Sequence, residues 1–518
     1  MQLPFGEWLP DQPEHLNPGA TVATNVYHAA SSYKPVKSLV GYSSNNIGKH
    51  SKGAASFRDN TNTVYTFVAT KTDIYQLDGG TFTSRKSGLT GTDTDFFTFT
   101  QFGNYVIASN GVDAPQYYLM GTSTNFANLS TIATNGTPPV FRTSGVIRDF
   151  LVTGNITNNT NRVQWSGLND IATWEAGISS SDLQDLPGSG GQIVAVTSGE
   201  VGYIFRQNQI VRMDFVGGNT VFRFSVISPN RGAVYGQTVC QDNRQIFFYA
   251  DDGFFQINGD QVIPIGSEKV NRFFENDLNK AFPDRISAAV DPFNTLAIWL
   301  YPSKNDTTNT TGICDRLLIY NYVTQKWSIA NVTASQIFSQ FVVANTVELM
   351  DLISENLDDI NISLDTPYWT SGHLYLGAVN GDYKAAIFSG VNLEAELETK
   401  ETEIFPGARA NITGVRPLVD ATANVIVKTR DRLADAVSSS TSSSMNSTGL
   451  SPVRKSGRYM RANVKIPSGN LWTHAQGIDL EASPGGLRWV IKLILIMLDI
   501  HLKHKNYFKD KLKKRSIH

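Results

Sequence analysis

The sequence is poor in cysteine and in charged residues, and each shortage narrows the classes of protein that it can encode. Two cysteines among 518 residues, Cys240 and Cys314, cannot build a disulfide framework and belong to no Cys-x-x-Cys pair, so we expect two reduced thiols in strands. Charged residues make up 17% of the chain and aromatic residues 11%, while glycine occurs 42 times. This composition is typical of a β-rich, turn-rich protein rather than a helical one.

Export and membrane signals are also missing. The opening residues MQLPFGEWLPDQPEHL contain neither a basic region nor an apolar run, so no signal peptide is expected. The most apolar stretch, Trp489 to Ile500, holds 12 residues including Lys492 and Asp499, whereas a membrane span needs about 20. We therefore expect no membrane contact in the assembled state.

No catalytic motif is present: the sequence contains neither Gly-x-Ser-x-Gly nor His-Glu-x-x-His, and its 8 histidines are scattered. Gly188, Gly190 and Gly191 precede a β-branched strand rather than a helix, which favours a turn over a phosphate site. The stretch Trp165 to Glu175 approximates the Asp-box turn of sialidase-type propellers, and that turn is a structural brace. We expect no enzyme activity and no catalytic, cofactor-binding or metal-binding residue.

Short strands separated by tight turns dominate what is there. Ile246 to Gly266 contains three apolar runs separated by Asp251-Asp252-Gly253 and Asn258-Gly259-Asp260, which predicts a three-strand meander. Similar units start at Val64, Asn104, Asp149, Val201, Leu296 and Gly372, at spacings of about 40 to 50 residues except for the last. This period predicts an all-β fold, a β-propeller of six or seven blades, followed by a smaller C-terminal β-sandwich-like domain. A long β-sandwich is the alternative.

The composition changes along the chain and predicts four parts. Two helical patterns interrupt the strands: residues 267–282, with Ser267 as a possible N-cap, and residues 346–359. The last part is interpreted either as a basic amphipathic tail or as translated read-through. The expected parts are an N-terminal arm (1–55), the propeller (56–391), the sandwich-like platform with a mobile Ser-rich loop at 438–449 (392–488), and the tail (489–518).

The net charge of −2 conceals an asymmetry. The tail holds 8 Lys/Arg against 2 Asp/Glu, so the body, residues 1–488, has 36 against 44, a net −8. A body of that sign is a poor clamp for duplex DNA, because DNA binding depends on neutralising phosphates with Lys and Arg. Glu394, Glu396 and Glu398 alternate, and the acidic stretch from Glu394 to Glu403 could hold a cation, but we expect it to be a solvent-facing edge strand. The following segment, Phe405 to Lys465, is basic, and we expect it to face protein or to touch DNA at Arg430, Arg432, Arg458 and Arg461.

Several segments, in their order along the chain, resemble one family: the tail-hub or tail-nozzle proteins of short-tailed bacteriophages, also called packaged-DNA stabilisation or head-completion proteins. The resemblance covers nearly all of residues 1–488, and the tail has no counterpart in it. The segments are LPDQPEHLNPGATVATNVYHAASSYKPVKSL, FGNYVIASNGVDAPQYY, GVIRDFLVTGN with NRVQWSGLNDIATWE, DLPGSGGQIVAV, YADDGFFQINGDQVIPIGSEKV and GRYMRANVKIPSGNLWTHAQGIDLEASPGGLR.

The resemblance implies a structural virion protein that forms a ring, with hexamer as the expected state, in the short tail below the portal adaptor. The ring would close the head and provide the conduit for genome retention and ejection. The implied partners are further copies of the chain, the portal adaptor, a tail fibre or tailspike, a tail needle or plug, and duplex DNA that passes through the lumen without sequence-specific binding. Assembly is expected in the host cytoplasm. The alternative function is a carbohydrate-binding or carbohydrate-cleaving propeller, as in a receptor-binding tail protein.

Overall fold

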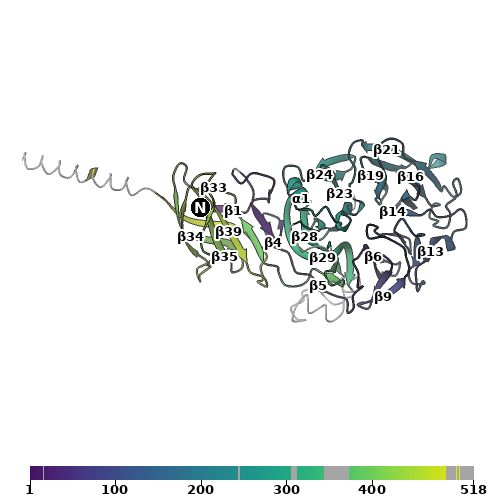
Figure 1. The fold of residues 1–518 in the computed structure, drawn as a ribbon, viewed down its shortest axis with the longest axis horizontal. Coiled ribbons are helices and arrows are strands. Elements are labelled where there is room, and N and C mark those ends of the chain that lie inside the picture. The colour runs from purple at the N-terminus through teal and green to yellow at the C-terminus, as the bar shows by residue number, and fades with distance from the viewer. Residues whose placement is uncertain are drawn as a thin grey trace, which may run out of the picture.

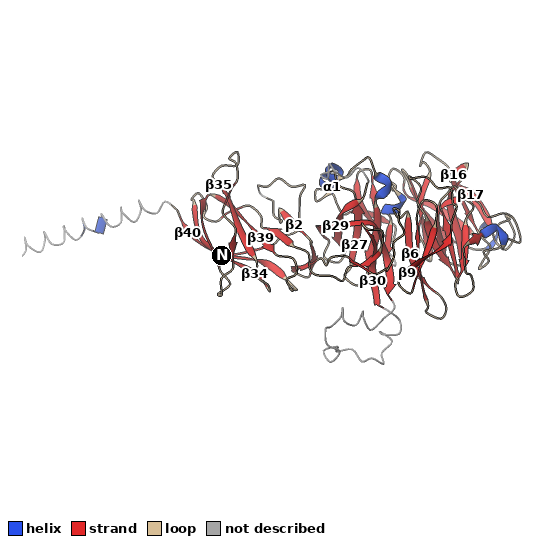
Figure 2. Cartoon of the chain, turned by 60° about the horizontal axis from the view of Figure 1, so that its bottom comes forward, coloured by secondary structure: helices blue, strands red, loops and turns tan. Residues whose placement is uncertain are grey.

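A computed structural model shows two β bodies side by side, a propeller and a sandwich (Figure 1). The structure describes residues 1–485 apart from 16, 243–244, 305–311 and 344–372, and beyond them only 497, 498 and 501. The helix expected at 346–359 and, apart from those three residues, the basic tail therefore lie outside the described residues. Seen from a second direction, the strands of both bodies stand side by side and the few helical turns lie at their margins (Figure 2).

Five blades are consecutive four-strand antiparallel meanders. The predicted meander at Ile246 to Gly266 is confirmed as three strands of the fifth blade, with Gly259 at φ +62° in its second turn. The blades comprise β6 (Gly53–Arg58), β7 (Val64–Ala69), β8 (Ile74–Asp78) and β9 (Thr81–Lys86); β10 (Thr98–Phe102), β11 (Tyr105–Ser109), β12 (Gln116–Leu119) and β13 (Ala127–Asn128); β14 (Phe141–Ile147), β15 (Phe150–Ile156), β16 (Asn159–Trp165) and β17 (Asp182–Asp185); β18 (Ile193–Val196), β19 (Val201–Arg206), β20 (Ile210–Phe215) and β21 (Phe222–Ser228); β22 (Cys240–Asp242), β23 (Gln245–Ala250), β24 (Gly253–Asn258) and β25 (Gln261–Pro264).

The sixth and seventh blades share one long strand. Blade 6 consists of β26 (Ser287–Asp291), β27 (Leu296–Tyr301), β28 (Cys314–Asn321) and the first half of β29 (Lys326–Val343). The second half of β29 is the inner strand of blade 7, where it pairs with β30 (His373–Asn380), which pairs with β31 (Ala385–Ile387). The outer strand of blade 7 is β5 (Val40–Gly41), from the other end of the chain. Blade 7 is thus closed by strands from both sides of the propeller sequence.

Hydrogen bonds between neighbouring blades close the ring at seven. Ser51 N donates to Ser335 Oγ at 2.9 Å between blades 7 and 1, and Val290 N donates to Ser339 Oγ at 2.8 Å between blades 6 and 7. Comparable bonds join the other neighbours: Phe97 N to Lys52 O, Thr100 Oγ1 with Ser144 Oγ, Val196 N to Thr143 Oγ1, Gln241 Nε2 to Ser198 O, and Trp299 Nε1 to Thr238 O. The propeller is confirmed, and seven is its blade number.

The sandwich is built from both ends of the chain. One sheet has the order β3-β4-β40-β34-β38 with β1 beside β40; the other has the order β2-β32-β39-β35 with β33 beside β39, and β36 and β37 beside β35. The propeller is therefore inserted between the fourth and the thirty-second strand of the chain. The bounds are β1 (Gln2–Pro4), β2 (Val22–Thr24), β3 (Val26–Ala29), β4 (Ser32–Pro35), β32 (Ala395–Glu398), β33 (Thr402–Glu403), β34 (Ala410–Val419), β35 (Asn424–Arg430), β36 (Ser438–Ser439), β37 (Ser443–Ser444), β38 (Ser451–Gly457), β39 (Tyr459–Ile466) and β40 (Ala475–Pro484).

The Ser-rich segment at 438–449, expected to be a mobile loop, lies along β35 instead. Its two short strands pair with β35, and Ser440 N donates to Val427 O at 2.8 Å. Met445 packs against the sandwich core. A Ser-rich segment can pair as a strand at the edge of a sheet, because strand pairing uses backbone N–H and C=O groups rather than side chains. The composition of this segment therefore did not predict its strands.

The N-terminal segment, residues 5–15, ties the sandwich to the propeller. Trp8 packs edge-to-face on Phe273 at 5.0 Å between ring centroids, and Lys269 Nζ lies 2.7 Å from Glu7 Oε1. The carboxylate of Asp11 accepts hydrogen bonds from Arg272 N at 2.8 Å and Phe273 N at 2.7 Å. These donors belong to the first turn of α1 (Asn271–Asp277), the helix expected at 267–282.

The expected cap of that helix is wrong. The N-cap residue is Val270, which makes no side-chain cap bond, and the Asp11 carboxylate takes the role predicted for Ser267. A carboxylate at a helix N-terminus satisfies free N–H groups and interacts favourably with the helix dipole.

One hydrophobic cluster runs through both bodies. It includes Phe254, Trp299 and Trp327 of blades 5 and 6 together with Leu397 and Val464 of the sandwich. The strand β2 also extends blade 6, because Thr24 pairs with Ile329 in parallel. The two bodies therefore share buried apolar surface as well as two crossings of the chain.

Candidate interaction surfaces

The acidic alternation at Glu394–Glu403 and the basic segment after it come together inside the sandwich. The strand β32 lies between β2 and β39, so it is not an edge strand. Glu398 is 1% exposed and Glu401 is 7% exposed. The expected solvent-facing acidic edge is therefore wrong for these two residues, while Glu394 is exposed.

Basic side chains from neighbouring strands neutralise these carboxylates. Arg461 Nε lies 2.9 Å from Glu398 Oε1, and Arg430 Nη2 lies 2.5 Å from Glu401 Oε2. Lys428 donates to Glu398 as well. Burial alone would raise the pKa of Glu398, but the hydrogen bond from Lys428 and the charge of Arg461 outweigh it and lower the pKa. We call this group, with Glu14, the buried ion cluster.

Glu14 of the N-terminal segment joins the buried ion cluster from outside. Its carboxylate lies 3.1 Å from Arg461 Nη1 and 3.5 Å from Arg430 Nη2. Both arginines are thus held by two carboxylates each, and their side chains are only 9% and 10% exposed. They are not available to a nucleic acid.

The four arginines that were expected to touch DNA therefore do not form a single surface. Arg458 is about half exposed and pairs with Glu403 at 2.7 Å, and Arg432 is 84% exposed beside Asp435 at 3.4 Å. Two of the four face solvent, each beside a carboxylate, and two are buried. The expectation of DNA contact is wrong for Arg430 and Arg461.

The inner strands of all seven blades line one small axial channel. Its volume is about 280 Å³, and Ala54, Thr98, Thr143, Ala195 and Ser287 are among its lining residues. A cavity of this volume matches a small molecule at most. Any passage wide enough for a nucleic acid would have to lie between copies of the chain rather than along this axis.

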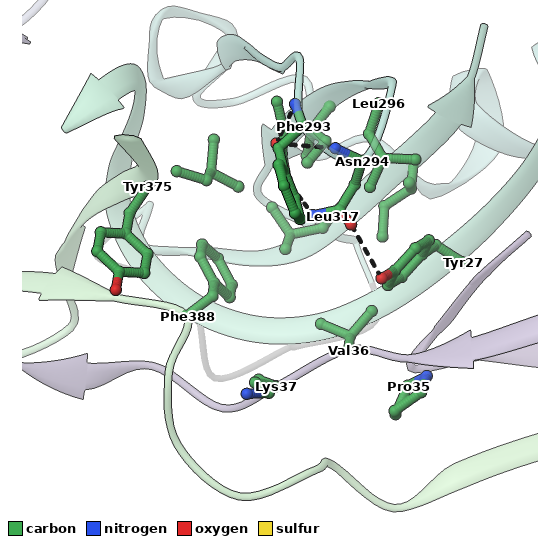
Figure 3. A pocket seen from close by; sticks show the side chains of 14 residues that line it. Tyr27, Pro35, Val36, Lys37, Phe293, Asn294, Leu296, Leu317, Tyr375 and Phe388 are labelled. Atoms are coloured by element: carbon green, nitrogen blue, oxygen red, sulfur yellow. Dashed lines mark hydrogen bonds between the residues drawn. The ribbon is translucent and has the colours of Figure 1, made fainter. Parts of the chain in front are cut away.

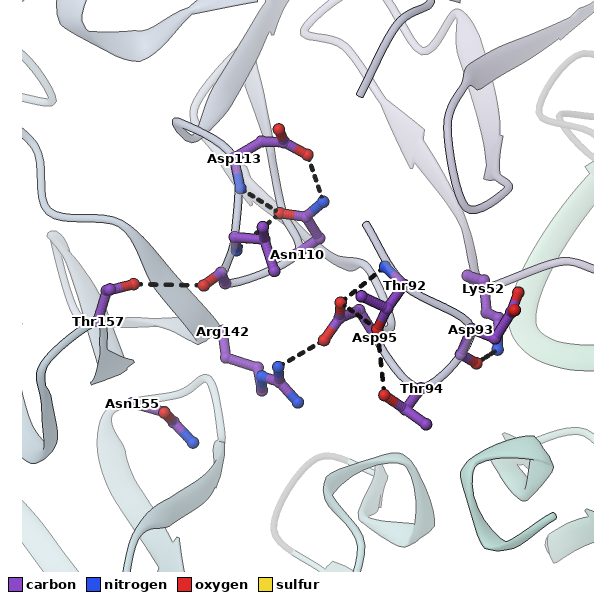
Figure 4. Close-up of polar contacts among 12 residues, drawn as sticks. Lys52, Thr92, Asp93, Thr94, Asp95, Asn110, Asp113, Arg142, Asn155 and Thr157 are labelled. Atoms are coloured by element: carbon purple, nitrogen blue, oxygen red, sulfur yellow. Dashed lines mark hydrogen bonds and ion pairs between the residues drawn. The ribbon is translucent and has the colours of Figure 1, made fainter. Parts of the chain in front are cut away.

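Charged side chains join loops of neighbouring blades, and Figure 4 shows Lys52 beside Asp93 and Arg142 beside Asp95. Lys52 Nζ lies 3.1 Å from Asp284 Oδ2 and also donates to Asp93 O. Arg142 Nη2 lies 2.6 Å from Asp95 Oδ1. Burial pulls the pKa of Asp95 upward, but the hydrogen bonds from Thr92 and the charge of Arg142 outweigh it and lower the pKa. Each of these charges has a partner, which indicates bracing between blades.

The Asp-box-like stretch folds as a braced turn between β16 and β17. Asp170 accepts hydrogen bonds from Ala172 N at 2.8 Å and Thr173 Oγ1 at 2.7 Å, and Gly167 N donates to Thr173 O at 2.8 Å. Ser166 Oγ accepts from Leu151 N at 3.1 Å. The carboxylate is fully used inside the turn, as a structural brace requires. The glycines at 188–191 lie between blades 3 and 4, which confirms the expected inter-blade turn.

The two cysteines are free and buried, in β22 and β28, as expected. Burial raises the pKa of both thiols, so the reactive thiolate is disfavoured. Among the described residues no group of three or more His, Cys, Asp or Glu could hold a metal ion. Over the same part of the chain, no helix has the length and apolar character needed to cross a membrane.

A second cavity, of about 310 Å³, lies where the propeller meets the linker to the sandwich (Figure 3). Its walls are largely apolar. Asp291 is occupied internally, because its Oδ1 accepts from Phe293 N at 3.1 Å and its Oδ2 from Asn294 Nδ2 at 2.7 Å. Tyr27 Oη donates to Asn294 Oδ1 at 3.2 Å. The lining residues include Val36, Lys37, Leu296, Leu317, Tyr375 and Phe388.

His28 lies beside this junction and should make the protein sensitive to acid. The residue is 2% exposed, and its Nε2 lies 3.0 Å from Lys326 Nζ. Burial, and then the charge of Lys326, lower the pKa of His28 to about 4. Below pH 6.5 the unfolded chain therefore binds a proton that the folded chain does not. Stability is complete above pH 6.5 and falls by about 2 to 3 kcal/mol as the pH drops to about 4.

Denaturant unfolding at a series of pH values tests this prediction. His28→Gln should flatten the loss of stability between pH 6.5 and 4. The same substitution at His474, which is half exposed, is the matched control and should leave the wild-type profile. A profile for His28→Gln as steep as that of the wild type would contradict the assignment.

The negative charge resides in the propeller. Residues 36–391 contain 31 Asp/Glu against 23 Lys/Arg, a net −8, whereas residues 1–35 and 392–485 together contain 13 against 12, a net −1. The basic residues of the sandwich are thus balanced by carboxylates of the same body. Six of the acidic residues in 36–391, and none of the basic ones, lie in residues 344–372, outside the described residues.

No protein-family model matches the sequence, and no curated protein matches it. Solved structures similar to this chain include the following two. One, from the "Crystal Structure of Mitotic Checkpoint Complex", is 9% identical, with a TM-score of 0.35, over 70% of this chain and 98% of that chain. The other, BamB from Moraxella catarrhalis, is 12% identical, with a TM-score of 0.36, over 70% of this chain and 95% of that chain. The assignment of a seven-bladed propeller is based on the strand pairing within this chain.

Proposed function

We propose that the chain is a structural subunit of the tail hub, or nozzle, of a short-tailed bacteriophage. Copies of it form a ring below the portal adaptor, with a hexamer as the expected state. The ring closes the filled head and provides the conduit for the genome. Its further partners are a tail fibre or tailspike and a tail needle or plug, and its place is the virion tail after assembly in the host cytoplasm.

The distribution of charge is the observation that carries this proposal. A conduit for DNA works best if its wall does not hold the phosphates, and a wall of net negative charge repels them over a Debye length of about 8 Å at physiological salt. The propeller has a net charge of −8 from 31 acidic and 23 basic residues. Of the four arginines expected to touch DNA, Arg430 and Arg461 are neutralised within the sandwich, and Arg432 and Arg458 each lie beside a carboxylate.

The mechanical arrangement supports the same function. A subunit under the pressure of packaged DNA must transmit force without separating into parts. Here the propeller is inserted into the sandwich, the two chain crossings are hydrogen-bonded to each other from Ser38 N to Val391 O at 2.8 Å, and residues 5–15 brace α1. Both bodies also share one apolar cluster.

The alternative, a glycan-binding or glycan-cleaving propeller, has less support. Sugar recognition needs open polar groups beside aromatic rings. The junction cavity has aromatic walls, but Asp291 and Asn294 are engaged with neighbouring groups. The Asp170 carboxylate is likewise consumed in its turn.

Electron microscopy of the purified protein tests the proposal. Rings of one defined symmetry, with a central opening wide enough for duplex DNA, are the expected result, together with recovery of the chain from purified virions. A glycan-binding assay on the same preparation tests the alternative. A protein that stays monomeric at the highest soluble concentration, or that binds or cleaves a glycan, would overturn the proposal.

A further inference from the structure

The four most exposed large hydrophobic side chains in the described part of residues 1–485 gather at the junction of the two bodies. Leu471 is 88% exposed, Phe293 77%, Val323 68% and Val391 60%. Single exposed apolar residues are ordinary, but a group of them marks an interaction site. We call these four residues and the adjoining cavity the junction surface.

Hydrogen bonds show that these four residues share one neighbourhood. Beside Phe293, Asn294 accepts from Tyr27 of the sandwich, and near Val323, Asn321 Nδ2 donates to His28 O at 3.0 Å. Next to Leu471, Asn470 O accepts from Asn392 Nδ2 at 2.9 Å. Val391 lies in the linker itself, where its carbonyl accepts from Ser38 N. Each residue is therefore within two positions of a bond between the propeller, the linker and the sandwich.

Phe293 is presented by a rigid turn. The carboxylate of Asp291 accepts from the backbone N–H groups of Phe293 at 3.1 Å and Asn294 at 3.2 Å. The ring lies over the apolar cavity with Leu317 and Phe388 nearby (Figure 3). A preorganised aromatic side chain beside an apolar pocket is typical of the residues that dominate binding energy at protein interfaces.

Two lysines carry the positive charge of the junction surface, and the carboxylate of Asp291, which also lines the cavity, accepts hydrogen bonds from Phe293 N and Asn294 N. Lys34 and Lys37 are exposed and form no ion pair with any described residue, and Lys37 lines the cavity. Lys34 lies opposite Tyr27 in the β3–β4 pair, so both side chains point to the same side of the sheet. The occupant should therefore be apolar with a negatively charged rim.

The chain carries a matching surface on its opposite side. Leu168 and Ile178 are 49% and 38% exposed in the connection before β17 of blade 3, where Leu168 N donates to Ser179 O. Beside them, Asp149 and Glu175 are exposed and form no ion pair with described residues. We call these four residues the blade 3 corner. Blade 3 is separated from blade 6 by two blades on one side and three on the other.

We infer that the junction surface of one copy binds the blade 3 corner of the next copy, which deepens the ring proposed above and rests on it. The two surfaces differ, so the contact is heterologous. Repetition of such a contact gives a ring if the rotation closes and a filament if it does not. Lys34 and Lys37 face Asp149 and Glu175, while Phe293 and Leu471 meet Leu168 and Ile178.

Sedimentation velocity of the full chain over a range of concentrations tests the apolar part. Phe293→Asp and Leu471→Asp should each raise the dissociation constant for self-assembly by about 30-fold or more, the size of a hot-spot loss. Val226→Asp is the matched control: Val226 is 52% exposed on β21 of blade 4, and its replacement should leave assembly unchanged. Circular dichroism confirms that each variant folds.

A charge exchange tests the partner. Lys37→Glu and Glu175→Lys should each weaken assembly, and the two changes in one chain should restore it, because opposite charges then face each other again. If rings persist in Phe293→Asp, or if the double variant does not regain assembly, the proposed contact is wrong. The proposed ring itself would not be contradicted by either result. If the wild-type chain forms filaments and Phe293→Asp does not, the contact is supported and the closed ring is contradicted.

Discussion

Replacing Arg461 with methionine is expected to lower the free energy of unfolding by about 3 kcal/mol or more. Arg461 is 8% exposed and lies 2.9 Å from the carboxylate of Glu398, which is 1% exposed. Methionine keeps much of the apolar stem but removes the charge, so Glu398 keeps only Lys428 as a cation. An insufficiently compensated buried carboxylate costs far more than the lost contact itself.

Arg432→Met is the matched control for that substitution. Arg432 belongs to the same body and also lies beside a carboxylate, Asp435, but its side chain is 84% exposed. Exposed pairs contribute between 0 and about 1 kcal/mol, so this variant should unfold almost like the wild type. Denaturant titration at neutral pH measures both. Equal stability of the two variants would show that the buried ion cluster is open to solvent.

The buried ion cluster also shows what the sequence can and cannot reveal. Alternating acids at Glu394, Glu396 and Glu398 and alternating bases in the strands Asn424–Arg430 and Tyr459–Ile466 are complementary patterns with the same period. Read together, they would have predicted cross-strand pairing. Read separately, the first indicates an exposed edge and the second a basic surface. No pattern marks Glu14, because it meets Arg461 across 447 positions of the chain.

The fold divides in the same way between local and long-range features. The meanders follow from turn residues and apolar runs a few positions apart, so the propeller could be predicted. The insertion of the propeller into the sandwich could not be predicted. It depends on strand pairs such as Leu3 of β1 with Ile478 of β40, and nothing in either strand's sequence indicates which strand it pairs with. The same holds for the closure of blade 7 by Val40 and Gly41.

The helix α1 illustrates how a distant residue replaces a local signal. Its apolar spacing could be recognised, and a serine stood close to its start. The cap is instead Asp11, whose two oxygens accept from Arg272 N and Phe273 N. A carboxylate is preferred at this position because it bears a full negative charge next to the positive end of the helix. The contact also joins the two bodies, which a cap from Ser267 would not do.

Trp327→Ala is expected to lower the free energy of unfolding by about 3 to 5 kcal/mol, the usual range for removing a buried aromatic side chain. Trp327 is 0% exposed, and its ring centroid lies 5.7 Å from that of Trp299 and 4.7 Å from that of Tyr320. Its Nε1 donates to Ile265 O at 2.9 Å, so alanine also leaves a buried carbonyl without its donor.

Phe293→Ala is the matched control, because Phe293 is 77% exposed and its removal should change the stability of the isolated chain by less than about 0.5 kcal/mol. The shape of the transition for Trp327→Ala carries further information. Its cluster continues into the sandwich at Leu397 and Val464, so both bodies should lose stability together and unfold in one transition that has moved to lower denaturant concentration. Two transitions, of which only one has moved, would mean that the bodies unfold independently; a subunit of that kind would be poorly suited to carry axial force through both bodies.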